Sequence, residues 1–95
     1  MRTTPLSLVG KALSHPIRIE MLKMLADGEL CGCEFAPKLE TNPSVVSRYL
    51  GLLERAGLIT SRREGVRVMW RLASPKVLEV LSELTDLVRA KEIVR

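Results

Sequence analysis

The stretch Asn42-Pro43-Ser44-Val45-Val46-Ser47-Arg48-Tyr49-Leu50-Gly51-Leu52-Leu53 decides the predicted fold. Asn42 is a preferred N-cap residue. Pro43 suits the first helical position, because the N–H group that proline lacks would have no partner there. The apolar side chains that follow recur at the spacing of one helix face, and they are Val46, Tyr49, Leu50 and Leu53. The stretch therefore predicts a helix with one buried face, which ends at Ala56-Gly57.

A shorter helix is expected just before this one, from about Glu34 to Leu39, with a tight turn at Glu40-Thr41 between the two. Pro37 limits its start, because proline is tolerated only in the first turn of a helix. The regular helix should therefore begin no earlier than about Cys33. Two short helices joined by a tight turn predict a helix-turn-helix over about residues 33–56.

A basic β-hairpin is expected after the helix-turn-helix. Residues 58–63 are typical of a strand, Glu64-Gly65 supplies a turn, and residues 66–72 alternate as a return strand. Alternation separates the return strand into two faces, one with Arg67, Met69 and Arg71 and the other with Val66, Val68, Trp70 and Leu72. The prediction is a mainly α fold with a small β-hairpin. It is a winged helix-turn-helix of order ααααββα, whose wing covers about residues 58–72.

Two flanking helices are expected at about residues 6–14 and 75–93. The 95 residues fit one domain, 1–95, and so small a domain buries only a modest core. The last helix nevertheless carries a long apolar stripe, formed by Val77, Leu78, Leu81, Leu84, Leu87 and Val88. The stripe is longer than the core needs, so the sequence predicts a homodimer.

The charge of the chain favours a polyanionic partner. The net charge is +4, and segment 36–72 carries all of it, with seven basic and three acidic side chains. Nucleic acid and an anionic membrane both fit such a balance. The chain has no apolar run of about 20 residues, as a membrane span needs, and Met1 to Val9 are too short and too polar for a secretory signal. We therefore expect a cytoplasmic protein with no membrane partner.

A helix about 10–12 Å in diameter fits the major groove of double-stranded DNA. The outward side chains at the start of the second helix are short or basic, and the hairpin tip should bring three arginines together. The expected DNA contacts are Asn42, Ser44, Val45, Ser47, Arg48, Arg62, Arg63 and Arg67. The alternative is an ordinary solvated basic face, or a winged helix that docks an acidic protein.

In the order and spacing of several segments, the sequence resembles the ArsR/SmtB metalloregulatory repressors. These segments are Lys11–Ile19, Glu29–Glu34, Asn42–Leu50, Leu53–Ile59 and Arg62–Gly65. The resemblance covers about Leu6 to Leu72, and the last helix matches in kind. It implies homodimers packed through the first and last helices. It also implies repression without effector and release of operator DNA when a metal or another effector binds.

Cys31 and Cys33 are the candidate effector ligands. The resemblance implies that a Cys-x-Cys pair here binds trivalent arsenic or antimony, for which thiolates are suitable soft ligands. The family pattern adds a third cysteine at the position of Ala36, so a third donor would have to be a small thiol, solvent or another group. Residues two apart on a regular helix point about 200° apart. A helix that begins only near Cys33 would let both sulfurs face one side.

Three other interpretations of the cysteines stay open: redox or sulfur-species sensing, another soft metal, or two small cysteines without an effector role. A thiol oxidoreductase is disfavoured, because the chain has no Cys-x-x-Cys and no base near the pair. We expect no enzyme, and no cofactor required for DNA binding. Zinc sensing through the last helix is disfavoured because that helix has no histidine. The single histidine, His15, is expected to be a cap or packing residue.

Overall fold

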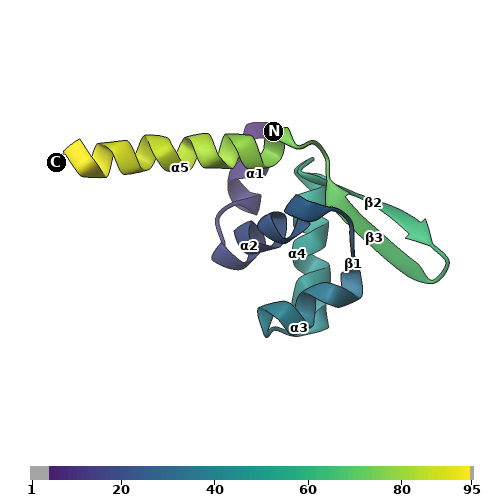
Figure 1. Cartoon of the computed structure of the whole chain (residues 1–95). Helices are drawn as coiled ribbons and strands as arrows, with labels where there is room; N and C mark the ends of the chain where they lie inside the picture. The colour runs from purple at the N-terminus through teal and green to yellow at the C-terminus, as the bar shows by residue number, and fades with distance from the viewer. Residues whose placement is uncertain (1–4, 95) are drawn as a thin grey trace.

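The computed structural model describes residues 5–94, with side chains through residue 90. The described part forms one body with a long projecting helix (Figure 1). Its helices are α1 (Pro5–Ala12), α2 (Pro16–Met24), α3 (Phe35–Leu39), α4 (Pro43–Arg55) and α5 (Lys76–Val94). Its strands are β1 (Leu30–Cys31), β2 (Ile59–Glu64) and β3 (Arg67–Leu72), and short 3-10 turns occupy Leu25–Asp27 and Gly32–Glu34. The predicted domain covers residues 1–95, and its two ends lie outside the described residues. Residues 1–4 of the segment that was judged unlike a secretory signal lie outside them as well.

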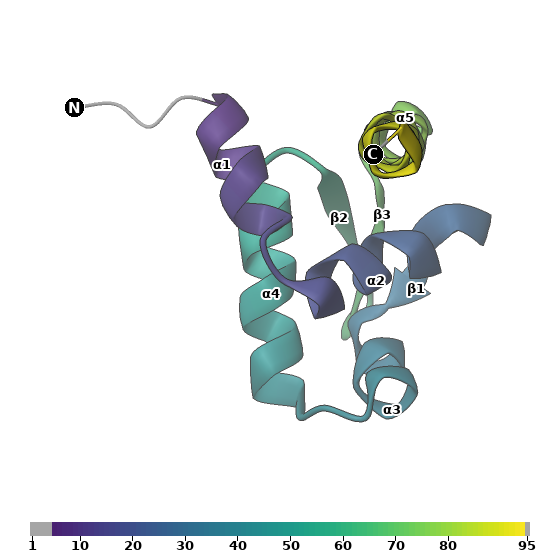
Figure 2. The same ribbon diagram turned by 90° about the vertical axis from the view of Figure 1, so that its left-hand side faces the viewer.

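The winged helix-turn-helix class is confirmed, and the predicted element order needs one addition. Strand β1 precedes α3, so the described order is ααβααββα. Sequence alternation cannot reveal a strand of two residues, which becomes a strand only by pairing with a distant partner. The helix-turn-helix itself follows the prediction, with α3 and α4 joined through Glu40, whose φ of 53° closes the turn (Figure 2).

The sheet has the order β1-β3-β2, and both pairings are antiparallel. In the hairpin Glu64 pairs with Arg67. The turn between them has two residues, and Gly65 adopts a φ of 64°, as the first position of a tight hairpin turn requires. Val66 therefore lies in the turn and is 97% exposed. The predicted start of the return strand at Val66 is one residue too early, because β3 begins at Arg67.

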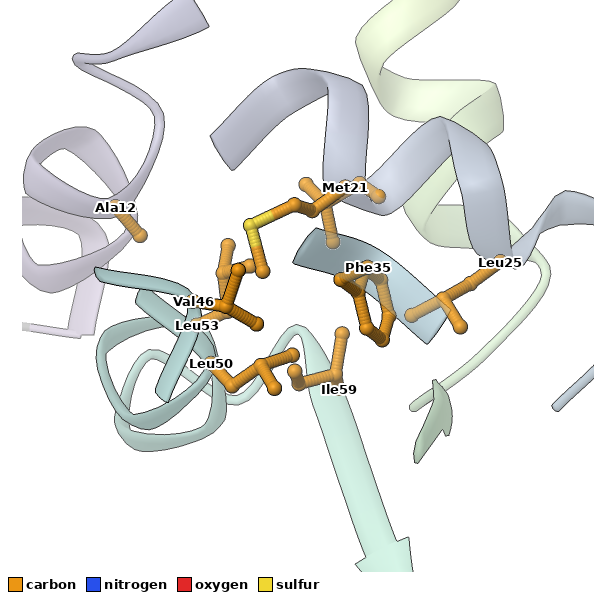
Figure 3. Packing of buried hydrophobic residues seen from close by; sticks show 9 residues of the cluster. Ala12, Met21, Leu25, Phe35, Val46, Leu50, Leu53 and Ile59 are labelled. Atoms are coloured by element: carbon orange, nitrogen blue, oxygen red, sulfur yellow. The ribbon is translucent and has the colours of Figure 1, made fainter. Parts of the chain in front are cut away.

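The core joins the helix-turn-helix to the base of the wing. Phe35 of α3 is fully buried at its centre, among side chains from α2, α4 and β2 (Figure 3). The largest of these neighbours are Met21, Leu22, Leu53 and Ile59. The ring of Phe35 packs closely among these side chains, and this packing holds α3 against α4.

A buried arginine fixes the end of α1. Arg18 is 7% exposed, and its guanidinium donates to the carbonyls of Ala12 at 2.8 Å and Lys11 at 3.0 Å. The same guanidinium lies over the ring of Tyr49 of α4, 4.7 Å from its centroid. Helix α1 is thus tied to α2 and α4 through one side chain. The predicted capping role of His15 is confirmed, since its Nδ1 accepts from the N–H of Ile17 at 3.1 Å.

Helix α5 extends well beyond the rest of the body (Figure 1). Its first turns pack on the core through Val77, Leu78 and Leu81. Side chains 82–90 are all exposed. Within residues 5–94, no helix combines the length and apolar character that crossing a membrane demands.

Candidate DNA-binding face and the adjoining cysteine pair

The N-terminal turn of α4 presents a small polar surface. The Oδ1 atom of Asn42 accepts from the N–H of Val45 at 2.9 Å, so Asn42 is the N-cap that the sequence predicts. The side chains of Ser44, Ser47 and Arg48 are exposed, whereas Val45 is half-buried. The opposite face is fixed in the core by Val46, Leu50 and Leu53. This arrangement lets the start of α4 approach another surface closely, with two hydroxyls and a guanidinium foremost.

Arg62 on β2 is held by two carboxylates. Its guanidinium donates to both carboxylate oxygens of Glu29, at 2.7 and 2.8 Å, and lies 2.8 Å from a carboxylate oxygen of Glu64. Hydrogen bonding to Arg62 lowers the pKa of Glu29. The hydrogen bond to Glu29 raises the pKa of Arg62 most, and the hydrogen bond to Glu64 raises it further. Arg62 therefore joins the wing to the loop before β1, and nearby acids compensate its charge.

The hairpin divides the three arginines expected at its tip: Arg62 and Arg67 lie on one face, and Arg63 lies on the other. Successive residues of a strand point to opposite faces, so Arg63 lies on the face opposite Arg62. Arg67 opposes Glu64 across the hairpin and acts on the two cysteines. Each arginine thus has a different environment. Sequence alternation within β2 already separates Arg62 from Arg63, and only the pairing with β1 brings Arg67 to the cysteines.

The two cysteine sulfurs face the same side of the chain. Cys31 ends β1 and is also the N-cap of the following 3-10 turn. The thiol of Cys33 donates to the Sγ atom of Cys31 at 2.7 Å, and the N–H of Cys33 points to the same sulfur at 3.4 Å. Both cysteines are free; Cys31 is 5% exposed, whereas Cys33 is exposed. The prediction that the regular helix begins no earlier than about Cys33 is confirmed, since α3 begins at Phe35.

The neighbourhood of the pair favours one thiolate and one thiol. Hydrogen bonds from the thiol and the N–H of Cys33 lower the pKa of Cys31, and the charge of Arg67 lowers it further. Donation of the thiol hydrogen to Cys31 raises the pKa of Cys33. The Cys31 charge in turn raises the pKa of Arg67. The sequence alone did not indicate Arg67 as the cationic neighbour, because the contact crosses about 35 residues of chain.

The two acidic residues nearest to the cysteines in sequence, Glu29 and Glu34, are both bound to other groups. The carboxylate of Glu34 accepts from the N–H of Cys31 at 2.7 Å, which completes a capping box around the 3-10 turn. The carboxylate of Glu29 is bound to Arg62. Both acids therefore stabilise the local backbone or the wing, while Arg67 supplies the charge next to the sulfurs.

An open groove connects the cysteine pair with α4 and the wing. Its walls include Cys31, Cys33, Ala36, Ser47, Arg67 and Trp70. The site thus adjoins the start of α4 on one side and β3 on the other. Among residues 5–94, no group of three or more histidine, cysteine or acidic side chains is arranged to hold a metal ion. Ala36, where the family pattern has a third cysteine, contributes only a methyl group to the groove.

A helix-turn-helix with an exposed polar helix start, followed by a basic wing, defines a DNA-binding regulator of the winged-helix class. The profile described as "Bacterial regulatory protein, arsR family" matches residues 15–61. The biofilm growth-associated repressor of Agrobacterium fabrum is 33% identical over 91 residues, which cover 96% of this chain and 78% of the relative. The chain belongs to the ArsR family, and it is a transcriptional regulator rather than an enzyme.

Two further comparisons agree with this assignment. The arsenical resistance operon repressor of Staphylococcus xylosus is 29% identical over 87 residues, which cover 92% of this chain and 83% of the relative. The solution structure of a homodimeric winged helix-turn-helix DNA-binding domain from Mycobacterium bovis gives a TM-score of 0.79 at 31% identity. It covers 94% of this chain and 82% of that domain.

The electrostatic role of Arg67 is testable by titration. In Arg67→Ala the first thiolate should form at higher pH than in the unchanged protein, because a positive charge that favours the thiolate is lost. Ultraviolet absorbance of the thiolate against pH, in effector-free protein, measures the shift. Arg63→Ala is the matched control and should leave the curve in place. An unchanged curve in Arg67→Ala would mean that Arg67 does not act on the cysteines.

Proposed function

We propose that this repressor binds operator DNA as a homodimer and is released when a thiol-binding effector, arsenite or antimonite, occupies Cys31 and Cys33. One observation carries the effector assignment: the two sulfurs lie 2.7 Å apart, on the groove between α4 and the wing. Soft trivalent ions prefer thiolate ligands. The similarity to an arsenical resistance operon repressor favours this ion class.

In this proposal, α4 enters the major groove. Ser44, Ser47 and Arg48 face the base edges, and the capped helix start at Asn42 and Val45 lies close to a phosphate. The wing then contacts the neighbouring backbone through Arg63 and, more weakly, Arg62 and Arg67. The ranking follows from the neighbours of each arginine: Arg62 is bound by two carboxylates, and the Cys31 charge acts on Arg67 and raises its pKa.

The homodimer is supported by the apolar face of α5. Val80, Leu84, Leu87 and Val88 are each about half exposed or more, and they recur at the spacing of one helix face. Leu6 of α1 is 79% exposed. A helix that leaves such a stripe in water is typical of an interface. The similar domain from Mycobacterium bovis is described as homodimeric. Two-fold symmetry then predicts operator half-sites about one helical turn, or a multiple of it, apart.

Release of DNA follows from the connection between the cysteines and the wing. Bonds from arsenic to both sulfurs remove the thiolate charge, so Arg67 loses its anionic partner. The same bonds impose a new S–S separation on a segment that pairs with β3 through Cys31 and Met69. Both changes act on the wing rather than on the core, and the proposed result is a wing that no longer fits the DNA backbone.

A redox effector is the second candidate, because the sulfur atoms of Cys31 and Cys33 are already in contact. Hydrogen peroxide would take two electrons from the two thiols. An S–S bond would form, the O–O bond would break, and the two thiol protons would leave in two molecules of water. The sulfur contact favours this reaction as much as it favours ion binding. The effector titration described below therefore includes an oxidant.

The unequal roles of the wing arginines give a first test. Arg63→Ala should weaken binding to a duplex obtained by selection from random DNA, and should lower the slope of log affinity against log salt by about one. Arg62→Ala should have the smaller effect, because Glu29 and Glu64 already compensate that charge. Fluorescence anisotropy at several salt concentrations measures both. An equal or larger loss in Arg62→Ala would contradict the ranking.

The dimer interface gives a second test. Leu87→Glu places a charge in the apolar stripe of α5 and should shift the protein from twice the chain mass toward the chain mass in sedimentation equilibrium. Burial of an unpaired charge at the interface is the physical reason. Glu83→Gln, on the same helix outside the stripe, should leave the mass unchanged. A dimeric Leu87→Glu protein would place the interface elsewhere.

The effector is tested on the protein–DNA complex. Arsenite, antimonite and peroxide are titrated separately, and release of the duplex is followed by anisotropy. We expect arsenite or antimonite to release the DNA from the unchanged protein, and Cys31→Ser and Cys33→Ser each to abolish release, because one thiol cannot chelate. Release by peroxide alone would favour the redox candidate. Unchanged release in both variants would remove the cysteines from the mechanism.

A further inference from the structure

We propose that Glu29, which is not among the expected DNA contacts, limits the affinity of the wing for DNA because it competes with phosphate for Arg62. The inference rests on the proposed contact between the wing and the DNA backbone. It gives an acidic residue just before β1 a part in DNA binding: this residue sets how tightly, and with what salt dependence, the protein binds a duplex.

The contact between Glu29 and Arg62 occupies the donors that a phosphate would use. The Nε atom and one terminal nitrogen of the guanidinium donate to the two carboxylate oxygens of Glu29, at 2.8 and 2.7 Å. Carboxylate and phosphate oxygens fit the same planar fork of an arginine, so the two anions compete for it. Glu64 shares the terminal nitrogen, at 2.8 Å. Because Glu29 binds the fork with both oxygens, it is the principal competitor.

The two partners differ in their access to solvent. The side chain of Arg62 is 50% exposed, whereas that of Glu29 is 28% exposed. A DNA phosphate can therefore reach the guanidinium more easily than it meets the carboxylate. Exposed ion pairs are weak, because water and salt screen them. A phosphate can thus displace Glu29, and the pair lowers the affinity for DNA without abolishing it.

The same carboxylate acts on a second basic side chain of the wing. Arg62 opposes Met69 across the hairpin, and Arg71 follows Met69 by two residues, so both arginines lie on one face. The hydrogen bond from Arg62 lowers the pKa of Glu29 most, and the charges of Arg62 and Arg71 lower it further. Glu29 is therefore ionised at neutral pH, and it compensates a face that carries both guanidinium groups.

Neutralising Glu29 should add a backbone contact rather than a base contact. Arginine contacts to phosphate release condensed counterions and carry no sequence information. The gain in affinity should therefore appear with random and selected duplexes alike, and it should make the salt dependence steeper. A purely structural role of the ion pair predicts the reverse, because a misplaced wing would bind DNA less tightly.

Glu29→Gln in the full chain isolates the charge, because the amide oxygen of glutamine can still accept from Arg62. We expect at least about threefold tighter binding to a random-sequence duplex at low salt, and a slope of log affinity against log salt that is steeper by about one for each bound protomer. Fluorescence anisotropy at several salt concentrations measures both. Glu20→Gln makes the same charge change at an exposed position of α2, outside the wing, and should have little effect.

Arg62→Ala removes the side chain through which Glu29 is proposed to act. In that background Glu29→Gln should give a smaller gain, because only direct repulsion between Glu29 and phosphate and the release of Arg71 remain. Glu64→Gln removes the other carboxylate from Arg62 and is a second variant, expected to tighten binding to a smaller degree.

Unchanged or weaker binding in both Glu29→Gln and Glu64→Gln would overturn the inference, and so would an equal gain from Glu29→Gln with and without Arg62. The thermal unfolding midpoint of each variant should stay near that of the unchanged protein, since an exposed ion pair contributes little to stability. If neither Arg62→Ala nor Arg63→Ala changes the affinity, the proposed contact between the wing and DNA is itself overturned, and this inference with it.

Discussion

The antiparallel pairing of Leu30 and Cys31 with Trp70 and Met69 is the constraint on which the functional arrangement depends. It converts a segment that would otherwise be a loop into the third strand of the wing sheet. The chain must then turn sharply to begin α3, and the 3-10 turn at Gly32–Glu34 makes this turn. Because Cys31 is both the last residue of the strand and the cap of the turn, the sulfur of Cys33 returns to it. A pair of side chains two residues apart thus shares one side of the backbone.

The basic side chains of the wing differ more than their sequence suggests. Arg62 is tied to Glu29 and Glu64, Arg67 acts on the cysteines, and Arg63 points to the other face of the hairpin. An exposed ion pair adds only about 0–1 kcal/mol to stability. The value of the pair between Arg62 and Glu29 is therefore geometric: it orients the wing against the loop that leads into β1. The wing is thus linked to both ends of β1: Arg62 binds Glu29 just before the strand, and β3 pairs with Cys31 at its end.

The cysteine pair and the polar start of α4 lie on one groove, so a chemical change at sulfur acts next to the DNA-binding face rather than at a distance. The core around Phe35 packs α3 against α4 through apolar contacts. In the proposed function, the wing changes its fit to DNA while this core stays packed.

The sequence by itself determined the winged helix-turn-helix. Asn42 and Pro43 start a helix by local backbone chemistry, the apolar period of α4 selects its buried face, and Gly65 permits the hairpin turn; these effects act over a few residues. The sequence also indicated that the cysteines precede regular helix. Only the tertiary structure decided that Leu30 and Cys31 form a strand, that Arg67 is the charge beside the sulfurs, and that Glu29 compensates Arg62. Those contacts join residues that are far apart along the chain, and local propensity carries no information about which distant partners meet.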